Sequence, residues 1–564
     1  MTTTDRSWRR GAVVYQIYPR SFADSDGDGV GDIPGITERV DYIADLGVDV
    51  VWLCPVYESP QVDNGYDISD YRSIHGEYGT LADWERLRDA LHERDVRLVM
   101  DLVVNHTSDE HEWFRRSRRE EGEYADYYHW VEGSPDERPN NWESMFGGPA
   151  WSYDDEREAW YLHLFDERMP DLNWPNPAVR ESLYEMIEWW LERGIDGFRL
   201  DVINLLSKAE GYPEGDPTAD PVGGEYFLTG PRIHEYVGEL VDRAFAGRDV
   251  VTIGETFDVT PADAHRFVVE DGLDMVFPFE HMDIDAGGSG PWDVVDWELA
   301  DLKAVTERWQ TAVGEGWIGL YLTNHDQPRI VSRFGDEAYR RESATMLATY
   351  LFTLCGTPFV YQGQELGMTN PDFESLEQYR DPATVDRVQR ALATGDIELF
   401  EEISEAVNYW SRDNARTPMQ WSDDEHAGFT AGEPWIKVND NYPEINAERE
   451  AADDESVLAY YRRLIRFRNE HPLAVYGAYE PLLADHSQVF AYRRTSDGDG
   501  DSDALVVLLN FADEVVSVEV PPDAASGDTE LLIGNYEGGS DGLAEPVDLR
   551  PYEARVYRVS SDRT

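Results

Sequence analysis

Lysine is almost absent from this chain, and positive charge is scarce throughout it. The 564 residues include 48 Lys plus Arg against 114 Asp plus Glu, which gives a formal charge of −66. Only Lys208, Lys303 and Lys437 are lysines, so the other 45 basic residues are arginines. A field of this sign repels nucleic acid, and we expect no nucleic-acid partner. Because the acids are spread along the whole chain, we interpret them as surface adaptation to molar salt, where self-repulsion is screened. A local acidic functional patch is the alternative.

Cysteine and long apolar runs are also scarce. Cys54 and Cys355 are the only cysteines, and both lie in apolar stretches. Two thiols in this setting are more often core residues than a disulfide or a metal site. No stretch reaches about 18 uninterrupted apolar residues, so we expect no membrane span. Residues 1–10 are polar and charged, unlike a signal peptide. A cytoplasmic protein is therefore the expectation.

What the chain does contain is a series of short apolar runs that alternate with helical patterns such as Leu81–Arg94 and Val179–Arg193. Eight strands alternating with helices predict an α/β protein with a closed parallel (β/α)8 TIM barrel. The eight predicted strands are Val13–Tyr18, Val48–Cys54, Arg97–Val104, Asp196–Val202, Val250–Gly254, Met275–Phe279, Trp317–Thr323 and Pro358–Tyr361.

Segments that lack this alternation predict the other units of the chain. We assign residues 1–104 and 175–478 to the catalytic barrel, with a polar and aromatic insertion at 367–455 after the eighth strand. Residues 105–174 follow the third strand, lack long periodicity and predict an inserted subdomain. Residues 479–564 contain alternating short runs that predict a C-terminal antiparallel β-sandwich. Its strands are expected at Val489–Tyr492, Leu505–Leu509, Val515–Val520 and Ala554–Val559.

Several predicted barrel strands end in charged or polar residues. Asp201, Glu255 and Asp326 end the fourth, fifth and seventh strands. In such barrels the chemistry lies at the carboxyl ends of the strands. Two carboxyl groups that flank a bond are the equipment of glycoside hydrolysis. Arg199 beside Asp201 is expected to lower the pKa of that nucleophile, and an apolar setting is expected to keep Glu255 protonated. If residues 197–202 are considered alone, the alternative is that Arg199 and Asp201 form a purely structural ion pair.

An acidic, glycine-rich loop follows the first predicted strand. Acidic residues at alternate positions, with glycines that turn the chain, suit a hard cation ligated by oxygen. The loop starts like an EF-hand, but the distal Glu and the flanking helices of that motif do not match. We predict a structural Ca²⁺ site, with Mg²⁺ as the alternative ion and a merely solvated loop as the other interpretation. The predicted ligands are Asp24, Asp26, Asp28, Asp32 and the Val30 carbonyl.

The sequence resembles the α-amylase superfamily, glycoside hydrolase family 13, over almost its full length. Motifs that carry the resemblance are Asp101–His106, Gly197–Asp201, Gly254-Glu255 and Asn324–Asp326. Within that family, three further stretches resemble the oligo-1,6-glucosidase and α-glucosidase branch, namely Gln16–Phe22, Asn64–Tyr71 and Arg412–Trp421.

The resemblance implies roles for individual residues. Asp201 corresponds to the nucleophile, Glu255 to the acid/base and Asp326 to the transition-state stabiliser. The resemblance also implies that Asp63, Tyr66 and Arg412 close the pocket at the non-reducing end, which makes the enzyme exo-acting. The implied substrate-binding residues are Asp63, Tyr66, His106, Phe165, Arg199, Val202, His325 and Arg412.

The same resemblance leaves several activities open. We expect a monomeric, retaining α-glucosidase that releases glucose from short oligosaccharides. Val202 accompanies cleavage of α-1,6 links in the family, and α-1,4 cleavage remains an alternative. A trehalose-6-phosphate hydrolase would need a basic phosphate subsite, which Arg could supply. Sucrose isomerase or trehalose synthase chemistry uses the same covalent intermediate. A non-catalytic transporter subunit of this family has a membrane span and lacks the carboxylates, so the sequence disfavours it.

Overall fold

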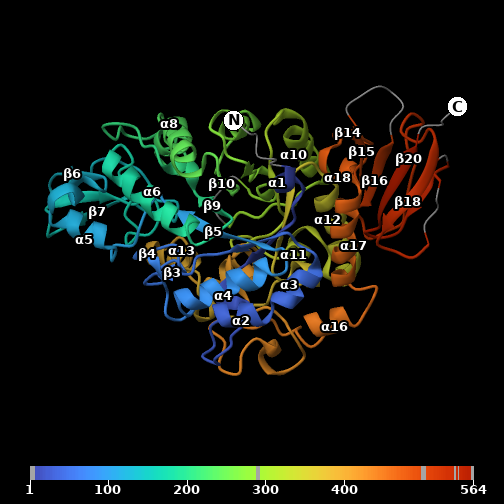
Figure 1. Ribbon diagram of the computed structural model, residues 1–564, viewed down its shortest axis with the longest axis horizontal. Coiled ribbons are helices and arrows are strands. Elements are labelled where there is room, and N and C mark those ends of the chain that lie inside the picture. The colour runs from blue at the N-terminus through green and yellow to red at the C-terminus, as the bar shows by residue number, and fades with distance from the viewer. Residues whose placement is uncertain (1–6, 288–291, 497–502, 539–541, 544, 561–564) are drawn as a thin grey trace.

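Eight parallel strands form the barrel at the centre of the molecule (Figure 1). The computed structural model describes residues 7–287, 292–496, 503–538, 542–543 and 545–560. The strands pair in chain order, β1 also pairs with β13, and a bridge between Val276 and Ile318 joins β11 to the segment of β12, which nearly closes the barrel. The predicted fold class is therefore confirmed. The barrel strands are β1 (Val14–Ile17), β2 (Val50–Leu53), β5 (Arg97–Val103), β9 (Gly197–Asp201), β10 (Val251–Glu255), β11 (Met275–Phe277), β12 (Gly319–Leu320) and β13 (Thr357–Tyr361).

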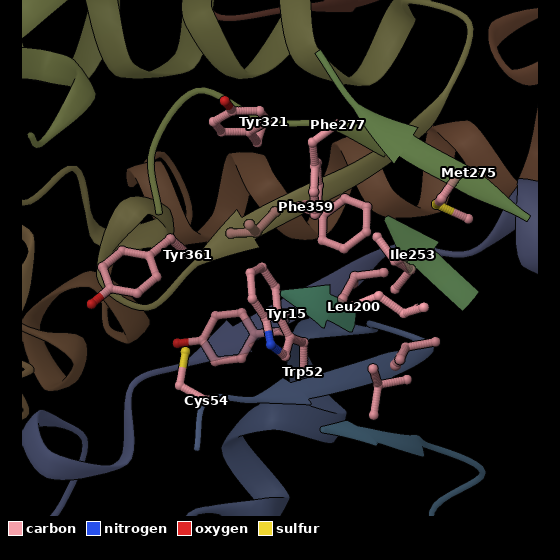
Figure 2. Packing of buried hydrophobic residues seen from close by; sticks show 14 of the residues in the cluster. Tyr15, Trp52, Cys54, Leu200, Ile253, Met275, Phe277, Tyr321, Phe359 and Tyr361 are labelled. Carbon is pink, nitrogen blue, oxygen red and sulfur yellow. The ribbon is translucent and has the colours of Figure 1, made fainter. Parts of the chain in front are cut away.

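Aromatic rings fill the interior of the barrel (Figure 2). Trp52 stacks on Phe277 at 6.0 Å between ring centroids, and Phe359 meets Phe277 edge-on at 4.7 Å. Cys54 is buried in the same core, and both cysteines are free thiols, as predicted. Because these rings pack closely inside the barrel, the carboxyl ends of the strands form a rigid base for a site.

One predicted barrel strand and one predicted helix differ most from the structure, and three C-terminal strands, Ala478–Leu482, Asp528–Gly534 and Val547–Leu549, were not predicted. The seventh strand shortens to Gly319–Leu320, and Thr323 instead donates its hydroxyl to the carbonyls of Gln327 and Pro328 as the chain turns. The helix predicted at Ile36–Leu46 divides into α2 (Ile33–Glu38) and α3 (Val40–Leu46). Helix α2 begins before the predicted start at Ile36 because Asp32 caps it by accepting a hydrogen bond from the Gly35 amide, and because Pro34 suits the first turn of a helix.

Helices surround the barrel and continue into the segments between its strands (Figure 1). Among the described residues, none of them is long and apolar enough to cross a bilayer. They are α1 (Ser7–Gly11), α2, α3, α4 (Leu81–His92), α5 (Glu112–Arg118), α6 (Pro177–Leu191), α7 (Gly224–Phe227), α8 (Ile233–Leu240), α9 (Pro261–His265), α10 (Leu299–Ala312), α11 (Ile330–Phe334), α12 (Arg340–Thr353), α13 (Pro382–Thr394), α14 (Ser404–Trp410), α15 (Asp413–Arg416), α16 (Ala447–Ala451), α17 (Val457–Glu470) and α18 (Pro472–Tyr476).

Two further sheets lie at opposite ends of the long axis of the molecule (Figure 1). After β5, the strands β6 (Trp130–Glu132), β8 (Ala159–Leu162) and β7 (Trp151–Asp154) form a small antiparallel sheet. The C-terminal part has a five-stranded antiparallel sheet, packed through a shared apolar core against the pair β17 (Val516–Val518) and β19 (Val547–Leu549). The five strands are β14 (Ala478–Leu482), β15 (Val489–Thr495), β16 (Ala504–Asn510), β20 (Ala554–Ser560) and β18 (Asp528–Gly534). A short antiparallel pair, β3 (Tyr57–Glu58) and β4 (Asp70–Ile74), flanks the loop of residues 59–69.

Candidate active site

The carboxyl ends of the barrel strands open into a pocket of about 320 Å³. Asp201 stands at the end of β9, Glu255 at the end of β10 and Asp326 six residues after β12, and all three line this pocket. Most of the other residues that the sequence predicts for substrate binding line it too, namely Asp63, Tyr66, His106, Phe165, Val202 and Arg412. Arg199 and His325 are not lining residues, but both contact the carboxylates.

A single guanidinium holds the first two carboxylates. Arg199 is fully buried and donates from Nη1 to Asp201 at 2.6 Å and to Asp101 at 2.5 Å. Its Nη2 forms an ion pair with Glu255. Because the two terminal nitrogens of one guanidinium hold Asp201 and Glu255, the two carboxyl groups are fixed close together.

Burial has the largest effect on the pKa values of the carboxyl groups around Arg199. It raises the pKa of Asp201 well above its ordinary value, since the opposing effect of Arg199 is outweighed once Glu255 and Asp101 add their charges. The expectation that Arg199 keeps this pKa low gave the right sign for the arginine and the wrong net direction. Burial also raises the pKa of Glu255, against the opposing effect of Arg199. One cation among three buried carboxyl groups favours retention of a proton within the group, as a general acid requires.

Asp326 has the opposite electrostatic environment. Its Oδ1 accepts from Arg416 at 2.7 Å and from Arg412 at 3.2 Å, and its Oδ2 lies 3.0 Å from Nε2 of His325. Burial acts to raise the pKa of Asp326, but His325 and the two arginines lower it well below its ordinary value. Asp326 is therefore a stable anion beside two carboxyl groups that hold protons more readily.

The ring of His325 is fixed from both sides. Gln16 donates from Nε2 to Nδ1 at 2.8 Å, so Nε2 carries the hydrogen and faces Asp326. The hydroxyl of Tyr66 lies 2.7 Å from the same Nε2, and the two rings stack at 5.4 Å between centroids. Gln16 belongs to β1, so the first strand sets the tautomer of a residue that follows the seventh.

His106 is one of the pocket-lining residues. Its Nε2 is buried and has no hydrogen-bond partner within the described part of the chain. Burial lowers the pKa of His106 to about 4, so the ring is neutral at physiological pH. Phe165 packs against it at 5.0 Å between centroids. A buried polar atom without a partner is costly unless a ligand satisfies it, and a sugar hydroxyl has the required chemistry.

Val202 adopts a backbone conformation that is unusual for a branched side chain. Its φ is 39° and its ψ is 42°, in the left-handed region that favours glycine. The conformation costs on the order of 1–3 kcal/mol, and it directs the Val202 amide to Oε2 of Glu255 at 3.0 Å. Val202 therefore holds the carboxyl group of Glu255 through its backbone and also lines the pocket.

Three further aromatic residues that line the pocket come from segments far apart in the sequence. Phe146 belongs to the segment after β5, Trp292 to a turn before α10, and Trp410 to the end of α14. Arg412 and Asp63 both line the pocket, and Nη2 of Arg412 donates to Asp63 at 3.2 Å. Burial raises the pKa of Asp63 against the effect of Arg412.

Several residues that shape the site were absent from the sequence-based list of site residues. Asp101, Arg416 and Asp381 each contact an arginine or carboxylate of the pocket. Asp101 and Arg416 lie within motifs that carry the family resemblance, so that signal was present. Asp381 lies in the long segment after β13 and has no local sequence signal, because its contact depends on how that segment folds over the barrel.

The acidic loop after β1 lies apart from the pocket lining. Carboxylate oxygens of Asp24, Asp26 and Asp28 come within 4.8 Å of one another, a donor set that suits a hard cation. The structure places Asp32 outside this group, since its oxygens accept from Ser25 and from the Gly35 amide. Partial burial acts to raise the pKa of Asp24, but hydrogen bonds from Thr430 and the loop amides lower it. Val30 donates its amide to Asp28 at 2.8 Å.

Comparison with known proteins agrees with this geometry. A family model described as the α-amylase catalytic domain matches residues 16–477. The chain belongs to the α-amylase family. It is 50% identical to the oligo-1,6-glucosidase of Parageobacillus thermoglucosidasius, over 98% of this chain and 99% of that protein.

Two solved structures in this family are similar over nearly the whole chain. The trehalose-6-phosphate hydrolase of Bacillus licheniformis has a TM-score of 0.92 and 45% identity, covering 98% of this chain and 100% of that one. The isomaltulose synthase of Klebsiella sp. LX3 has a TM-score of 0.93 and 40% identity, covering 98% and 99%. Proteins with this fold thus include both a hydrolase and a synthase.

Proposed function

We propose that this protein is a retaining, exo-acting α-glucosidase that releases terminal glucose from short α-linked oligosaccharides. The observation that carries the proposal is the pairing of Asp201 and Glu255 on one guanidinium beside the anionic Asp326. Close spacing of two carboxyl groups is the arrangement of double displacement, whereas inverting enzymes leave room for a water molecule between them. The pocket of about 320 Å³ is closed by Asp63 and Arg412, which supports exo-action on short substrates.

The proposed reaction has two steps. Asp201 attacks the anomeric carbon, the glycosidic C–O bond breaks, and the proton of Glu255 passes to the leaving oxygen. Glu255, now ionised, then takes a proton from a water molecule that attacks the same carbon and releases Asp201. The fixed charge of Asp326 favours the positive charge that develops on the sugar ring in both transition states.

The preferred linkage is proposed to be α-1,6, as in isomaltose. Support comes from the similarity to an oligo-1,6-glucosidase at 50% identity and from Val202, whose side chain lines the pocket beside Asp201. The test is incubation in molar KCl with isomaltose, maltose, sucrose, trehalose and trehalose-6-phosphate, followed by NMR of the products. Fast release of α-glucose from isomaltose supports the proposal. Initial release of β-glucose, or rearranged disaccharide as the main product, contradicts it.

A second candidate activity is trehalose-6-phosphate hydrolysis. Arg387 of α13 lines the pocket, and among the described residues no carboxylate forms an ion pair with it. A guanidinium without a carboxylate partner suits a phosphate group on the leaving sugar. Arg387→Gln separates the two candidate activities. If the phosphate group binds at Arg387, the substitution should lower kcat/KM for trehalose-6-phosphate much more than kcat/KM for neutral sugars. If it does not, the substitution should change kcat/KM for both kinds of substrate to a similar extent.

The acidic loop is proposed to hold a structural Ca²⁺ or Mg²⁺. Asp24, Asp26 and Asp28 would supply carboxylate oxygens, and the ion would neutralise part of their mutual repulsion. The loop is tied to a distant segment, because the Asp24 amide donates to the Phe429 carbonyl at 3.0 Å. An ion there would therefore stabilise the contact between the first barrel loop and the segment that follows β13.

We also propose that the enzyme works as a monomer in the cytoplasm of a salt-accumulating cell. The support is the charge of −66 with three lysines. Such a charge keeps copies of the chain apart in dilute buffer and is screened only at high ionic strength.

A further inference from the structure

Asp381 is one of the pocket-lining residues and comes from the segment that follows β13. It is the N-cap of α13, and its carboxylate is only 1% exposed. The Oδ2 atom accepts from the Thr384 amide at 3.1 Å and from the Thr384 hydroxyl at 2.6 Å. Ala383, Thr384 and Arg387 of the same helix line the pocket. One oxygen of Asp381 therefore anchors a helix that forms part of the pocket wall.

The other oxygen of Asp381 reaches the catalytic carboxylates through two arginines. Its Oδ1 accepts from Nε of Arg412 at 2.9 Å and from Nη2 at 2.5 Å, and Nη1 of Arg416 lies 3.8 Å away. Both guanidiniums also donate to Oδ1 of Asp326, at 3.2 Å from Arg412 and 2.7 Å from Arg416. Two parallel cationic bridges thus connect one oxygen of Asp381 to one oxygen of Asp326.

The backbone that carries Asp381 is held as well. Asp413 accepts the amides of Arg380 at 2.6 Å and of Asp381 at 2.9 Å on one oxygen. Asp413 begins α15, the short helix that ends with Arg416. The arginines and the carboxylate that orients them are therefore fixed to each other through the main chain, and their relative position does not depend on long flexible side chains alone.

We propose that Asp381 is a positioning residue for the transition-state stabiliser, linking the packing of α13 to the orientation of Asp326. The proposal rests on the proposed α-glucosidase function. Without the carboxylate, Arg412 loses two of its donor contacts and is free to turn toward Asp63 and Asp326. A shift of about 1 Å in a charged group at the reacting centre lowers turnover roughly 100-fold. The alternative is that Asp381 only caps α13, which predicts a loss of stability without a specific loss of chemistry.

Asp381→Asn separates the two interpretations. Asn is as good an N-cap as Asp, so the substitution keeps the cap and removes the charge that the arginines share. We expect kcat on p-nitrophenyl α-glucoside to fall by about 100-fold, with a smaller change in KM. Because Asp326 stabilises positive charge, the Ki of the cationic inhibitor 1-deoxynojirimycin should rise more than the Ki of glucose. Asp381→Glu keeps the charge but displaces it by one methylene, so it should retain more activity than Asp381→Asn.

Asp336→Asn is the matched control. Asp336 caps a short 3-10 turn, Glu337–Tyr339, and contacts no arginine of the pocket. Its kcat and inhibition constants should equal those of the wild type. Near-wild-type kcat and an unchanged inhibitor ratio in Asp381→Asn would overturn the proposal and leave only the cap. If that variant does not fold, the inhibitor ratio of Asp381→Glu decides, because capping alone predicts no change in it.

The proposed function can fail independently. If the wild type releases no glucose from any α-glucoside, that function is wrong. The positioning role is then judged by calorimetric binding of 1-deoxynojirimycin to the wild type and to Asp381→Asn. Equal affinities for the inhibitor in the two proteins would contradict it.

Discussion

The pocket and the outer surface of this protein both contain carboxylates and arginines, but the two regions differ in how closely these charges are paired. In the pocket, six carboxyl groups, all buried except the partly exposed Asp326, lie in direct contact with three arginines, at distances fixed by the barrel and its loops. Over the whole chain, 114 acids face 48 basic residues, and many acids are exposed. Salt screens exposed charges strongly and buried pairs weakly. The comparison teaches that one composition contains two electrostatic regimes, which should respond differently to salt.

Within the pocket, the ratio of cations to carboxyl groups decides which acid keeps a proton. Arg199 alone serves three carboxyl groups, and burial raises the pKa values of Asp201 and Glu255. Arg412 and Arg416 together contact Asp326, whose pKa is held well below its ordinary value, and Asp381, whose pKa falls to about 2 despite its burial. The pKa values of the carboxyl groups are thus raised where cations are few, and lowered at Asp326 and Asp381, where cations are many.

The largest effect is expected from removing the carboxyl group of Asp201 or of Glu255, the proposed nucleophile and acid/base. Asp201→Ala or Glu255→Gln should each lower kcat by about 10⁴-fold or more, because the two groups act as a unit on one bond. Assays with an aryl α-glucoside and melting curves would show the loss of turnover in a folded protein. Near-normal turnover in either variant contradicts the assignment. The ratio to wild type should be the same in 0.5 M and 3 M KCl, since the pair is buried.

A second prediction concerns the cations that hold Asp326. Arg416→Gln removes a donor at 2.7 Å and should lower kcat roughly 100-fold, as loss of one preorganised electrostatic contact does. Arg39→Gln is a matched control, since Arg39 lies over Trp421 outside the pocket lining. If the pocket and the surface are separate regimes, added KCl should not restore the activity of Arg416→Gln. Recovery of activity in 3 M KCl would count against this separation.

A third prediction uses pH within the Arg199 group. The charge of Asp101 raises the pKa of Asp201, so Asp101→Asn should lower that pKa. More of the nucleophile is then ionised in acid, and the acidic limb of kcat/KM should move to lower pH. The loss at the optimum should be smaller than in Asp201→Ala, because both reacting groups remain. A pH–rate profile of each enzyme checks this, and a limb that stays in place or moves to higher pH contradicts it.

The sequence allowed the barrel to be predicted because its signals are local. Each strand is a short apolar run, and residues such as Asp201 and Glu255 follow directly from where such a run ends. Asp63 and Arg412 were expected only through family resemblance, since their contact spans 349 positions. Asp381 gave no signal, because an Asp before Pro382 is an ordinary helix cap until the fold brings two arginines to it.

The predictions for the pKa of Asp201 and for the role of Asp32 differ from the structure because both depend on residues that are distant in the sequence or on local folding. The net pKa of Asp201 depends on Asp101 and Glu255, which come from other strands, whereas only Arg199 is a neighbour in the sequence. The role of Asp32 as a helix cap competes with its predicted role as a metal ligand, and spacing alone does not separate the two. Local sequence shows which groups are present, and tertiary packing sets their charge.

The surface regime should appear in the response to salt. Raising KCl from about 0.1 M to 1 M shortens the Debye length from about 10 Å to about 3 Å and removes most repulsion between separated carboxylates. Melting temperature and activity should therefore rise together, and desalting should inactivate the enzyme. Excluded salts such as sulfate should add to this by strengthening apolar burial. A melting temperature unchanged between 0.1 M and 3 M KCl would rule out adaptation of the whole surface.

The smallest effect is expected at the acidic loop, which shares one property with each region. Its carboxylates are clustered like those of the pocket, and those of Asp26 and Asp28 are exposed like those of the surface. Replacing Asp24 and Asp28 by Ala should abolish the calcium dependence of the melting temperature, while kcat changes little because the loop does not line the pocket. An ion present at 100 times its Kd adds about 2.7 kcal/mol, which corresponds to a shift of only a few degrees in a protein of this size. The control is Asp136→Ala with Glu137→Ala, which removes two exposed acids elsewhere and should leave the calcium response intact. If general screening accounts for the loop, KCl should replace Ca²⁺ fully, and chelation in 3 M KCl should leave the melting curve unmoved. A bound ion instead predicts that a calcium-dependent shift persists at high salt and is lost only in the loop variant.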